Sequence, residues 1–396
     1  MKAKKTCNKG RRFEVADIFR LYGEKYQTQN RLSIEQLKVM RHITNCRTSA
    51  MGGHIKICDE CDFTQNAYNS CRDRHCPKCQ TMVKEKWLND RKAEILPCGY
   101  FHNVFTLPHD LNNLILYNKS ICFSILFAAV KETLQAFAKD PQWRLTGQLG
   151  FIAVLHTWNQ LLLDHFHLHC LIPAGALSFD KKAWRSAGKK KKYLFKIGSL
   201  AKEFKKRYLG KLRKAFLNNE VNLPPDTTKE GFTALVKKAE KKQWIAYIKR
   251  PFAGPEQVLE YLGRYTHRVA ITNNRIKSIN NGEVTFTYKD RKSDNKIKET
   301  TISADKFIHR FLLHVLPKRF VKIRYYGFLA HTNKKQSIPV IFKLIEPDAK
   351  LPEKIVESID EMMLRLTGRD ISLCPKCKKG KLITKGRLLP VFLNSS

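Results

Sequence analysis

The sequence predicts an α+β protein, because two antiparallel hairpins are separated by segments with helical patterns. In the first hairpin, the apolar runs 149–158 and 165–173 are joined by the short connection "NQLLLD". Such a compact link between two strand-like runs is typical of antiparallel neighbours. In the second, "RVAITNNRIKSI" and "EVTFTYKD" meet near Asn281-Gly282, a dipeptide that favours the tight turn of a hairpin. We therefore expect sheets of antiparallel strands.

Composition divides the chain into four parts. Residues 1–33 form a basic lead-in with one short amphipathic helix, and residues 34–95 form a cysteine-rich domain that we expect to bind zinc and recognise DNA. The main domain covers 96–345, and a lysine-rich helical insertion interrupts it at about 180–250. Residues 346–396 form a tail that carries one more CxxC pair.

Within the main domain, the first strand lies in "YFHNVFTLPHDL", where apolar residues alternate before a proline ends the strand. A helical segment precedes it, and helices fill about 112–145. In the insertion, aromatic residues alternate with lysines, which favours a surface that contacts nucleic acid. The alternative is that the lysines form an ordinary solvated face. The aromatic residues are Trp184, Tyr193, Phe195, Tyr208, Trp244 and Tyr247.

The net charge of the chain favours a polyanionic partner. Lys and Arg number 74 against 35 Asp and Glu, which gives a net charge of +39. A fold does not require this excess, whereas binding to phosphates does, because each neutralised phosphate releases counterions. A membrane surface is the alternative, but no stretch approaches the roughly 18 apolar residues of a spanning helix. The basic N-terminus also lacks the apolar segment of a secretion signal, so we expect nucleic acid as partner, no membrane, and a prokaryotic cytoplasmic location.

Two CxxC pairs in the cysteine-rich domain predict a zinc site. Cys58 and Cys61 form one pair, and Cys76 and Cys79 form the other, with 14 residues between the pairs. Each pair offers two thiolates from one tight turn, and two pairs complete a tetrahedron around Zn²⁺. The alternative is a set of reduced structural thiols. A closed four-thiolate site is normally structural, so this domain is expected to recognise DNA.

Further ligand types in the sequence leave the number of zinc ions open. Cys46, His54, Cys71 and His75 lie close to the two pairs, and they either bind a second zinc ion or only pack and form hydrogen bonds. The tail pair, Cys374 and Cys377, is half a site by itself. It either belongs to a degenerate zinc ribbon or shares a metal ion with another chain.

Three histidines occupy every second position of "DHFHLHC": His165, His167 and His169. On a strand these imidazoles share one face, while Phe166 and its alternate neighbours point into the other layer. Packing alone is a poor explanation for three imidazoles at this spacing. Neutral imidazoles are common ligands of divalent ions, and two on one strand leave coordination positions open for phosphate oxygens and water. This pattern predicts Lewis-acid catalysis.

Tyr261 and Tyr265 are four residues apart in "EYLGRYTHR", so they share one face of a predicted helix. With Val258 and Leu262 they also fit a plain core stripe. A phenol is nevertheless a capable nucleophile toward phosphorus, and a covalent phosphotyrosine divides strand transfer into two steps. Two tyrosines beside a metal ion could hold two DNA ends in succession.

These motifs together resemble the HUH superfamily of single-strand nucleases, and within it the two-tyrosine transposases of the insertion-sequence-ninety-one family. The stretch 46–80 is similar to that family's zinc-binding domain, and "FHNVFTLPH" to its first nuclease motif. "LHTWNQLLLDHFHLHCLIPAGAL" resembles the histidine motif, and "YLGRYTHRVAITNNRI" resembles the tyrosine motif. "IRYYGFLAH" is similar to a further stretch near the end of that domain. The motifs follow the family's order and cover nearly the whole chain.

The resemblance implies a role for each matching residue. His167 and His169 correspond to the metal-binding pair, and His165 is then an auxiliary ligand or a proton-transfer group. A third ligand is expected, for which His156 and Gln257 are the candidates. Phe166 stands where the family commonly has proline, a change expected to alter only the entry of the strand.

The tyrosine motif implies two nucleophiles, Tyr261 and Tyr265. Arg264 and Arg268 flank them and are expected to contact DNA, either by stabilising charge on the reacting phosphate or as backbone-phosphate contacts. The neighbouring His267 has a role at the site or is an exposed residue at the end of the helix.

The fold implied by the resemblance places the histidines centrally on an antiparallel sheet, with the tyrosine helix packed so that its hydroxyls face the metal. Mg²⁺ or Mn²⁺ would polarise a phosphodiester of single-stranded DNA at the transposon ends and target. Attack by a tyrosine would give a 5′-phosphotyrosine and a free 3′-OH, as rolling-circle transposition requires. Since the chain has no GxxxxGK[ST] loop, unwinding would fall to a host helicase or the replication machinery.

Two alternatives to this activity stay open. A replication initiator would use the same nick-and-join chemistry. A non-catalytic zinc-dependent DNA-binding protein would account for the cysteines and the charge, but it would not need the histidines and tyrosines. The sequence leaves the oligomeric state open.

Overall fold

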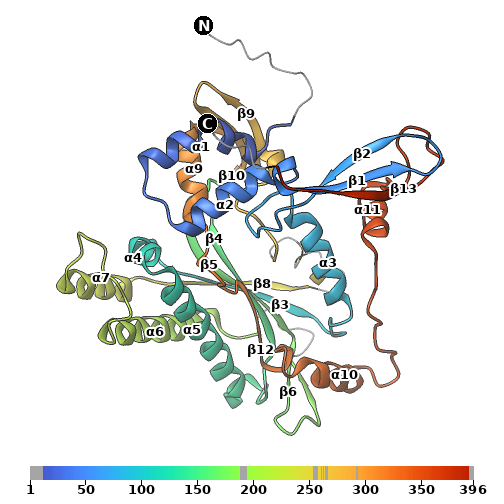
Figure 1. The fold of residues 1–396 in the computed structure, drawn as a ribbon. Helices are drawn as coiled ribbons and strands as arrows, with labels where there is room; N and C mark the ends of the chain where they lie inside the picture. The colour runs from blue at the N-terminus through green and yellow to red at the C-terminus, as the bar shows by residue number, and fades with distance from the viewer. Residues whose placement is uncertain are drawn as a thin grey trace.

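A five-stranded antiparallel sheet lies at the centre of the molecule (Figure 1). The computed structural model describes residues 12–187, 194–252, 257–259, 261, 263, 266–290 and 293–391. Neighbouring strands of the central sheet are antiparallel throughout. In order across the sheet they are β12 (Ile323–Tyr326), β4 (Phe151–Trp158), β5 (Asp164–Pro173), β3 (Tyr100–Thr106) and β8 (Ile245–Phe252).

Helices pack around the central sheet and around a second, three-stranded sheet. Three of them begin at serine caps that the sequence supplies: Ser33, Ser303 and Ser358 each accept a hydrogen bond from the backbone N–H three residues later. The helices are α1 (Val15–Gln29), α2 (Ile34–Asn45), α3 (Gln80–Lys92), α4 (Asn112–Tyr117), α5 (Lys119–Lys139), α6 (Ile197–Leu217), α7 (Lys229–Lys241), α9 (Ala304–Leu313), α10 (Lys334–Ile345) and α11 (Ile359–Thr367).

The central sheet is the middle of three layers. On one face α5 and α6 bury Phe105 and Phe166, both of which are almost fully enclosed. On the other face Val258, Phe328 and residues of α10 pack over Leu171. Figure 1 shows α5 and α6 on one side of the sheet and α3 and α10 on the other. Each face of the sheet therefore has its own hydrophobic core.

The second predicted hairpin forms a separate sheet with one additional strand. It consists of β9 (Ile276–Asn280), β10 (Glu283–Asp290) and β11 (Lys296–Ser303). The turn between β9 and β10 has positive φ at both central residues, +48° at Asn281 and +81° at Gly282, which matches the right-handed twist of a hairpin. α9 packs on this sheet and on α1, where Phe19 and Phe311 meet edge to face at 5.4 Å.

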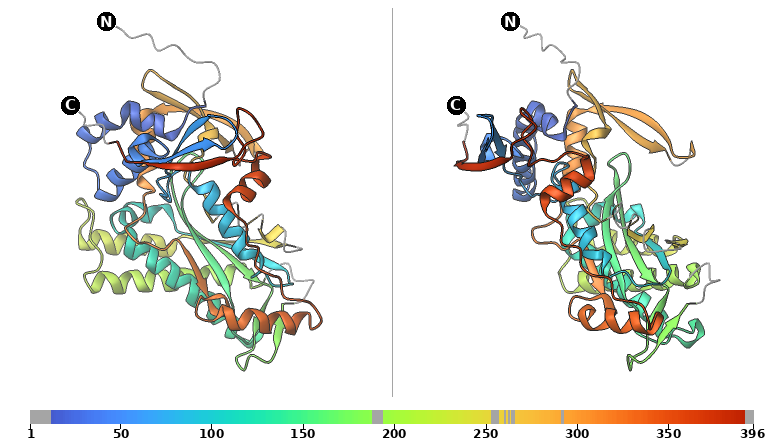
Figure 2. Two further views of the ribbon diagram at one scale, coloured as in Figure 1. Left: turned by 45° about the vertical axis from the view of Figure 1, so that its right-hand side comes forward. Right: turned by 90° about the vertical axis from the view of Figure 1, so that its right-hand side faces the viewer.

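A third sheet extends away from the central sheet and joins both ends of the chain (Figure 2). We call it the outer sheet. It is antiparallel, in the order β13 (Leu382–Leu388), β1 (Gly53–Cys58) and β2 (Thr64–Tyr68). A small two-stranded sheet consists of β6 (Gly175–Leu177) and β7 (Trp184–Ser186).

The structure differs from the predicted division of the chain in three places. The boundary expected at residue 33 separates α1 from α2, although the two helices pack together. The region 180–250 is not an appended insertion, because α6 covers the main core and β8 is an edge strand of the central sheet. The tail expected at 346–396 is not separate either, because β13 pairs with β1.

Three of the six aromatic residues expected to face nucleic acid are core residues instead. Tyr208 lies on the apolar face of α6, which turns inward while the lysines of this helix face solvent. Phe195 and Trp244 lie in the segments just before α6 and just before β8. Trp184 is half-buried against Phe328, Tyr193 lies outside the described residues, and Tyr247 is 52% exposed on β8. The residues buried in the main core are Phe195, Tyr208 and Trp244.

One described helix, α5, is long and apolar enough by length and composition to cross a membrane. Just over half of its apolar window, 56%, is buried inside the molecule. Phe123, Leu126 and Phe127 of this helix are among the fully buried residues of the main core. The core helix of a soluble protein can also be this long and apolar, and the packing of α5 is that of a core helix.

Replacing Trp244 with alanine is expected to lower the free energy of unfolding by about 3–5 kcal/mol. The indole is 4% exposed and donates its Nε1–H to the carbonyl of Ala239, so its loss leaves a cavity and an unpaired carbonyl. Tyr247→Ala, on the strand β8 that follows Trp244, is the control, with an expected change within about 0.5 kcal/mol. Denaturant unfolding measures both. A stable Trp244→Ala variant with weakened DNA binding would contradict the core assignment.

Candidate active site and metal centres

β5 divides its side chains between the two faces of the central sheet. Phe166, Leu168 and Cys170 are buried in the core beneath α5 and α6. His167 and His169 occupy the alternate positions, and each keeps 8% of its surface exposed on the opposite face. The division that alternation predicts is therefore the one that the strand adopts.

His156 joins these two histidines from the neighbouring strand. The register pairs His156 with His167 and Val154 with His169, and residues directly opposite in an antiparallel pair share a face. One ring nitrogen from each of the three histidines lies within 4.8 Å of the other two. His156 is one of the two residues expected to supply a third ligand. The other, Gln257, is an exposed residue of the helical segment 257–259.

The spacing of the nitrogens fits a single divalent ion. The Nε2 atoms of His167 and His169 are 3.0 Å apart. Two ligands at right angles, each about 2.1 Å from one ion, are about 3.0 Å from each other. The carbonyl oxygen of His165 lies 2.7 Å from Nδ1 of His167, so Nδ1 carries the proton and Nε2 keeps a free lone pair.

The side chain of His165 lies at the edge of this group. Its ring is half-buried, 4.6 Å from the ring of His167 and 5.5 Å from that of His109. The group of three described histidines whose nitrogens converge does not include it. The backbone carbonyl of His165 orients His167, and the imidazole of His165 lines the same cavity as the three histidines.

His102 contacts the site from β3 and was not recognised in the sequence. Its Nε2 lies 2.9 Å from Nδ1 of His169, and it is only 2% exposed. Val104 pairs with His169, so His102, two residues earlier, shares its face. The alternation of side chains along β3 could have predicted which face His102 occupies. Its closeness to the other histidines could not be predicted without knowing that β3 pairs with β5.

Tyr261 approaches the same imidazole. Its hydroxyl lies 3.4 Å from Nδ1 of His169, and its ring is 4.4 Å from that of His102. The side chain is 7% exposed and packs in a hydrophobic cluster that includes Val258. Tyr261 is therefore a core residue whose hydroxyl reaches the histidines. Arg264 and Tyr265 lie outside the described residues.

The electrostatic surroundings keep the imidazole of His169 neutral. Burial lowers the pKa of His169 well below its ordinary value, and the charges of neighbouring imidazoles and Arg268 lower it further. Neutral imidazole is the form that binds metal. His267 is also neutral at pH 7, because burial, with Lys322 and Lys84, lowers its pKa to about 4. Its ring lies 5.5 Å from that of Trp87 on α3.

The three histidines line a cavity of about 340 Å³. Arg268 and Lys289 also line it, and both continue into an adjoining cavity of about 610 Å³. The second cavity adds Lys84, Arg275 and His267. Arginine and lysine side chains along one cleft attract polyanions, and Arg268 is the link between the histidines and this positive surface.

The cysteines form two four-thiol clusters, and neither is the predicted one. The two CxxC pairs of the cysteine-rich domain do not share a site. β1 carries the first pair to the outer end of the outer sheet, whereas the second pair lies where α3 begins. Among the described residues, the clusters do not include His54 or His75. The first cluster is Cys46, Cys71, Cys76 and Cys79, and the second is Cys58, Cys61, Cys374 and Cys377.

The first cluster has the geometry of a closed zinc site. The Sγ atom of Cys79 lies 3.6 Å from those of Cys46 and Cys71. Four sulfurs about 2.3 Å from one zinc ion are about 3.8 Å apart in a tetrahedron. Hydrogen bonds from the neighbouring thiols hold the pKa of Cys79 well below its usual range. Cys46, Cys76 and Cys79 are buried in the core formed with α1 and α2.

Comparison with known proteins shows which family the chain belongs to. A family model described as "Putative transposase" matches residues 150–337, and one described as "Transposase zinc-binding domain" matches residues 18–107. "Putative transposase y4qJ" of Sinorhizobium fredii is 43% identical over 378 residues, 94% of each chain. The chain belongs to the insertion-sequence-ninety-one family of transposases.

A more distant relative extends the comparison. The transposase for insertion sequence element IS801 of Pseudomonas savastanoi pv. phaseolicola is 26% identical over 321 residues, 78% of this chain and 74% of that protein. No solved structure matches the chain. The matched zinc-binding region contains the whole first cluster but only the first pair of the second.

Cys79→Ser is expected to remove one equivalent of zinc from this transposase and to lower the temperature of unfolding. The Sγ atom of Cys79 meets two other thiols of the first cluster, and the cluster lies in the core with α1 and α2. Cys98→Ser is the matched control, since Cys98 belongs to neither cluster. Metal analysis and thermal unfolding of both variants provide the test. Unchanged zinc content in Cys79→Ser would contradict the assignment.

Proposed function

We propose that this transposase cleaves and rejoins single-stranded DNA through a 5′-phosphotyrosine. The observation that carries the proposal is the contact of Tyr261 with His169, whose other ring nitrogen turns toward His167. A nucleophile in contact with one of three convergent metal-ligand side chains is what phosphoryl transfer to a tyrosine needs. A purely DNA-binding protein has no use for them.

His156, His167 and His169 are the residues that would hold a catalytic divalent ion. Bound there, Mn²⁺ or Mg²⁺ would supply Lewis-acid polarisation of the scissile phosphodiester. The donor set is three neutral nitrogens, and imidazole binds transition ions more tightly than Mg²⁺. Mn²⁺ is therefore the better probe of this site.

In the proposed step the hydroxyl oxygen of Tyr261 attacks phosphorus. A bond forms between the phenol oxygen and phosphorus, and the bond from phosphorus to the 3′ oxygen breaks. The phenol loses its proton and the 3′ oxygen gains one, so no net proton is consumed. Attack by a 3′-OH on the phosphotyrosine reverses the same bonds and rejoins a strand. Tyr265 is the proposed second nucleophile, which would hold a second end.

The cleft defines a path for the substrate. Arg268 and Lys289 line both cavities, and Lys84 and Arg275 extend the positive surface away from the histidines. We assign these side chains to the phosphates of a single strand that reaches the tyrosine. Strand separation is assigned to a host helicase or replication, because the sequence has no phosphate-binding loop of its own.

Formation of a covalent protein–DNA adduct tests the proposal. A labelled single-stranded oligonucleotide that carries the terminus of the element is incubated with protein and Mn²⁺, and SDS-resistant adducts are measured. Tyr261→Phe is expected to lower adduct formation more than about 100-fold, because the nucleophilic oxygen is lost. The double variant Tyr261→Phe with Tyr265→Phe, and His167→Ala with His169→Ala, are expected to form no adduct.

Tyr247→Phe is the control for loss of a tyrosine hydroxyl, since Tyr247 is exposed on β8. An adduct that survives in the double tyrosine variant would contradict the proposal. Tight metal-independent binding without any adduct would favour the non-catalytic DNA-binding protein. Adducts with a plasmid origin, but not with element termini, would favour the replication initiator. The names of both relatives favour transposition.

His102→Phe is expected to weaken Mn²⁺ binding about 10–100-fold, the usual effect of losing a residue that orients a metal ligand. Phenylalanine keeps the buried ring but cannot accept the hydrogen bond from Nδ1 of His169. His102→Gln is expected to restore part of the affinity, because its side-chain oxygen can accept that bond. Calorimetric titration with Mn²⁺ measures the effect, with His54→Phe as the remote control. Equal affinities in all variants would refute this positioning role.

A further inference from the structure

The second thiol cluster joins segments from opposite ends of the chain. Cys58 is the last residue of β1 and Cys61 follows it, whereas Cys374 and Cys377 lie in the segment before β13. The Sγ atoms of Cys58 and Cys377 are 3.7 Å apart, and those of Cys61 and Cys374 are 3.8 Å apart. These distances match the edge of about 3.8 Å in a tetrahedron of sulfurs around zinc. A disulfide would require about 2.05 Å.

We propose that the chain binds a second structural zinc ion through these four cysteines, and that this ion fastens the C-terminal strand β13 to the outer sheet. The matched zinc-binding region ends at residue 107, so it does not contain the second pair. The proposal is independent of the tyrosine chemistry. It replaces both sequence-based expectations for the tail pair, a degenerate ribbon and a metal shared between chains.

Both pairs have the backbone arrangement of a metal-binding turn. The N–H of Glu60 points at Sγ of Cys58 at 3.4 Å, and the N–H of Gly380 points at Sγ of Cys377 at 3.3 Å. Backbone N–H groups that donate to sulfur stabilise the thiolate, the form that binds metal. In each turn a backbone N–H therefore stabilises the thiolate form of one cysteine, and the sulfurs of the two turns converge on one point.

The two turns are also joined to each other. The N–H of Lys381 donates to the side-chain carboxylate of Asp59 at 2.7 Å, and the N–H of Asp59 donates to the carbonyl of Lys381 at 3.1 Å. A Cβ on Gly380 would lie 2.5 Å from Sγ of Cys58 and 2.6 Å from the carboxylate of Asp59. Only glycine permits so close an approach of the tail to the first turn.

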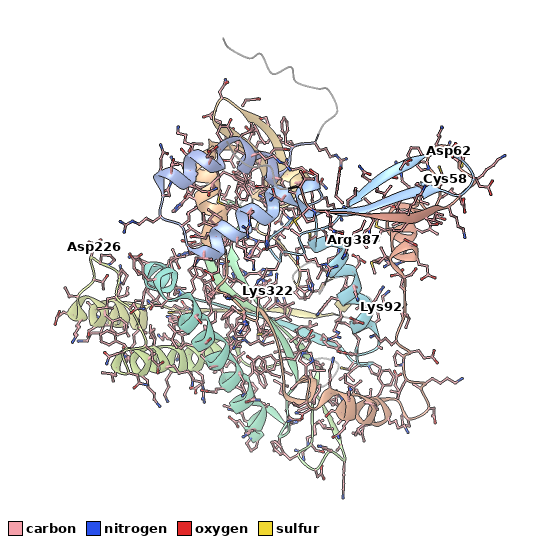
Figure 3. The ribbon with its side chains drawn as sticks, viewed as in Figure 1. Cys58, Asp62, Lys92, Asp226, Lys322 and Arg387 are labelled. Atoms are coloured by element: carbon pink, nitrogen blue, oxygen red, sulfur yellow. The ribbon has the colours of Figure 1, made fainter. Side chains whose placement is uncertain are left out.

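The outer sheet needs a fastening because it has little core of its own. β2 has four exposed residues of its five, and β13 has no buried residue. Small sheets with so little buried surface are marginal in water unless a metal or disulfide holds them. Figure 3 shows Cys58 at the outer end of this sheet and Arg387 nearer the body of the molecule. The cluster therefore lies at the end of the sheet that points away from the body of the molecule.

Zinc content of the full-length protein tests the stoichiometry. Wild type is expected to hold two zinc ions per chain, and Cys374→Ser with Cys377→Ser is expected to hold one. Gly380→Ala, which keeps all four thiols, is expected to lose zinc in the same way. Cys98→Ser is the control and should keep two. One zinc ion in the wild type, or two in the double variant, would overturn the proposal. Retention of the first zinc shows that the double variant is folded.

Cleavage between α10 and α11 tests the fastening. A protease site is placed within residues 351–356, which the structure shows to be exposed and without helix or strand. After cleavage of the wild type, the C-terminal fragment is expected to co-elute with the rest of the chain in gel filtration. In the Cys374→Ser, Cys377→Ser variant it is expected to elute separately. Co-elution in both proteins would mean that strand pairing alone holds the tail, and it would overturn the fastening role.

Discussion

The pairing of β4 with β5 in a single register is the constraint on which the catalytic geometry depends. Side chains alternate along a strand, so a slip by one residue would turn His167 and His169 into the helical core and expose Phe166 in their place. The opposite face prevents the slip, because Phe166 packs against Phe123 at 5.5 Å beneath α5. Hydrophobic packing on one side of the sheet therefore fixes the positions of the histidines on the other side, without an additional structural element.

His169 connects the components of the site. Its Nε2 turns toward His167, and its Nδ1 lies within reach of His102 and the hydroxyl of Tyr261. Burying a polar ring without partners is costly, and contacts on both nitrogens remove that cost while fixing the orientation of the ring. The group of three convergent histidines and the hydroxyl of Tyr261 are thus connected through one imidazole, that of His169.

Local patterns in the sequence predicted those parts of the fold that depend on neighbours along the chain. Alternation located β4, β5 and the face of His167, and Asn281-Gly282 located a hairpin turn that the structure confirms. Partners distant in sequence were beyond such patterns. Nothing in "CDEC" specifies that its thiols meet those of Cys374 and Cys377, and pairing by proximity gave the wrong cluster. His102 required knowledge of strand order, and the buried aromatic residues of 180–250 required knowledge of which surfaces of the fold are covered.

α3 physically connects the first thiol cluster to the tyrosine helix. The helix begins immediately after Cys79, its N-cap residue, so the cluster fixes the position of its first turn. Near its other end, Leu88 lies so close to Gly263 that a Cβ there would be 2.9 Å from a methyl of the leucine. The returning tail braces the same helix, because Glu357 accepts a hydrogen bond from Asn89. α3 is therefore held at one end by the first thiol cluster and contacted near the other end by the segment that carries Tyr261. The same helix borders the thiol cluster and the tyrosine segment, so their relative position is fixed by the packing of this one element.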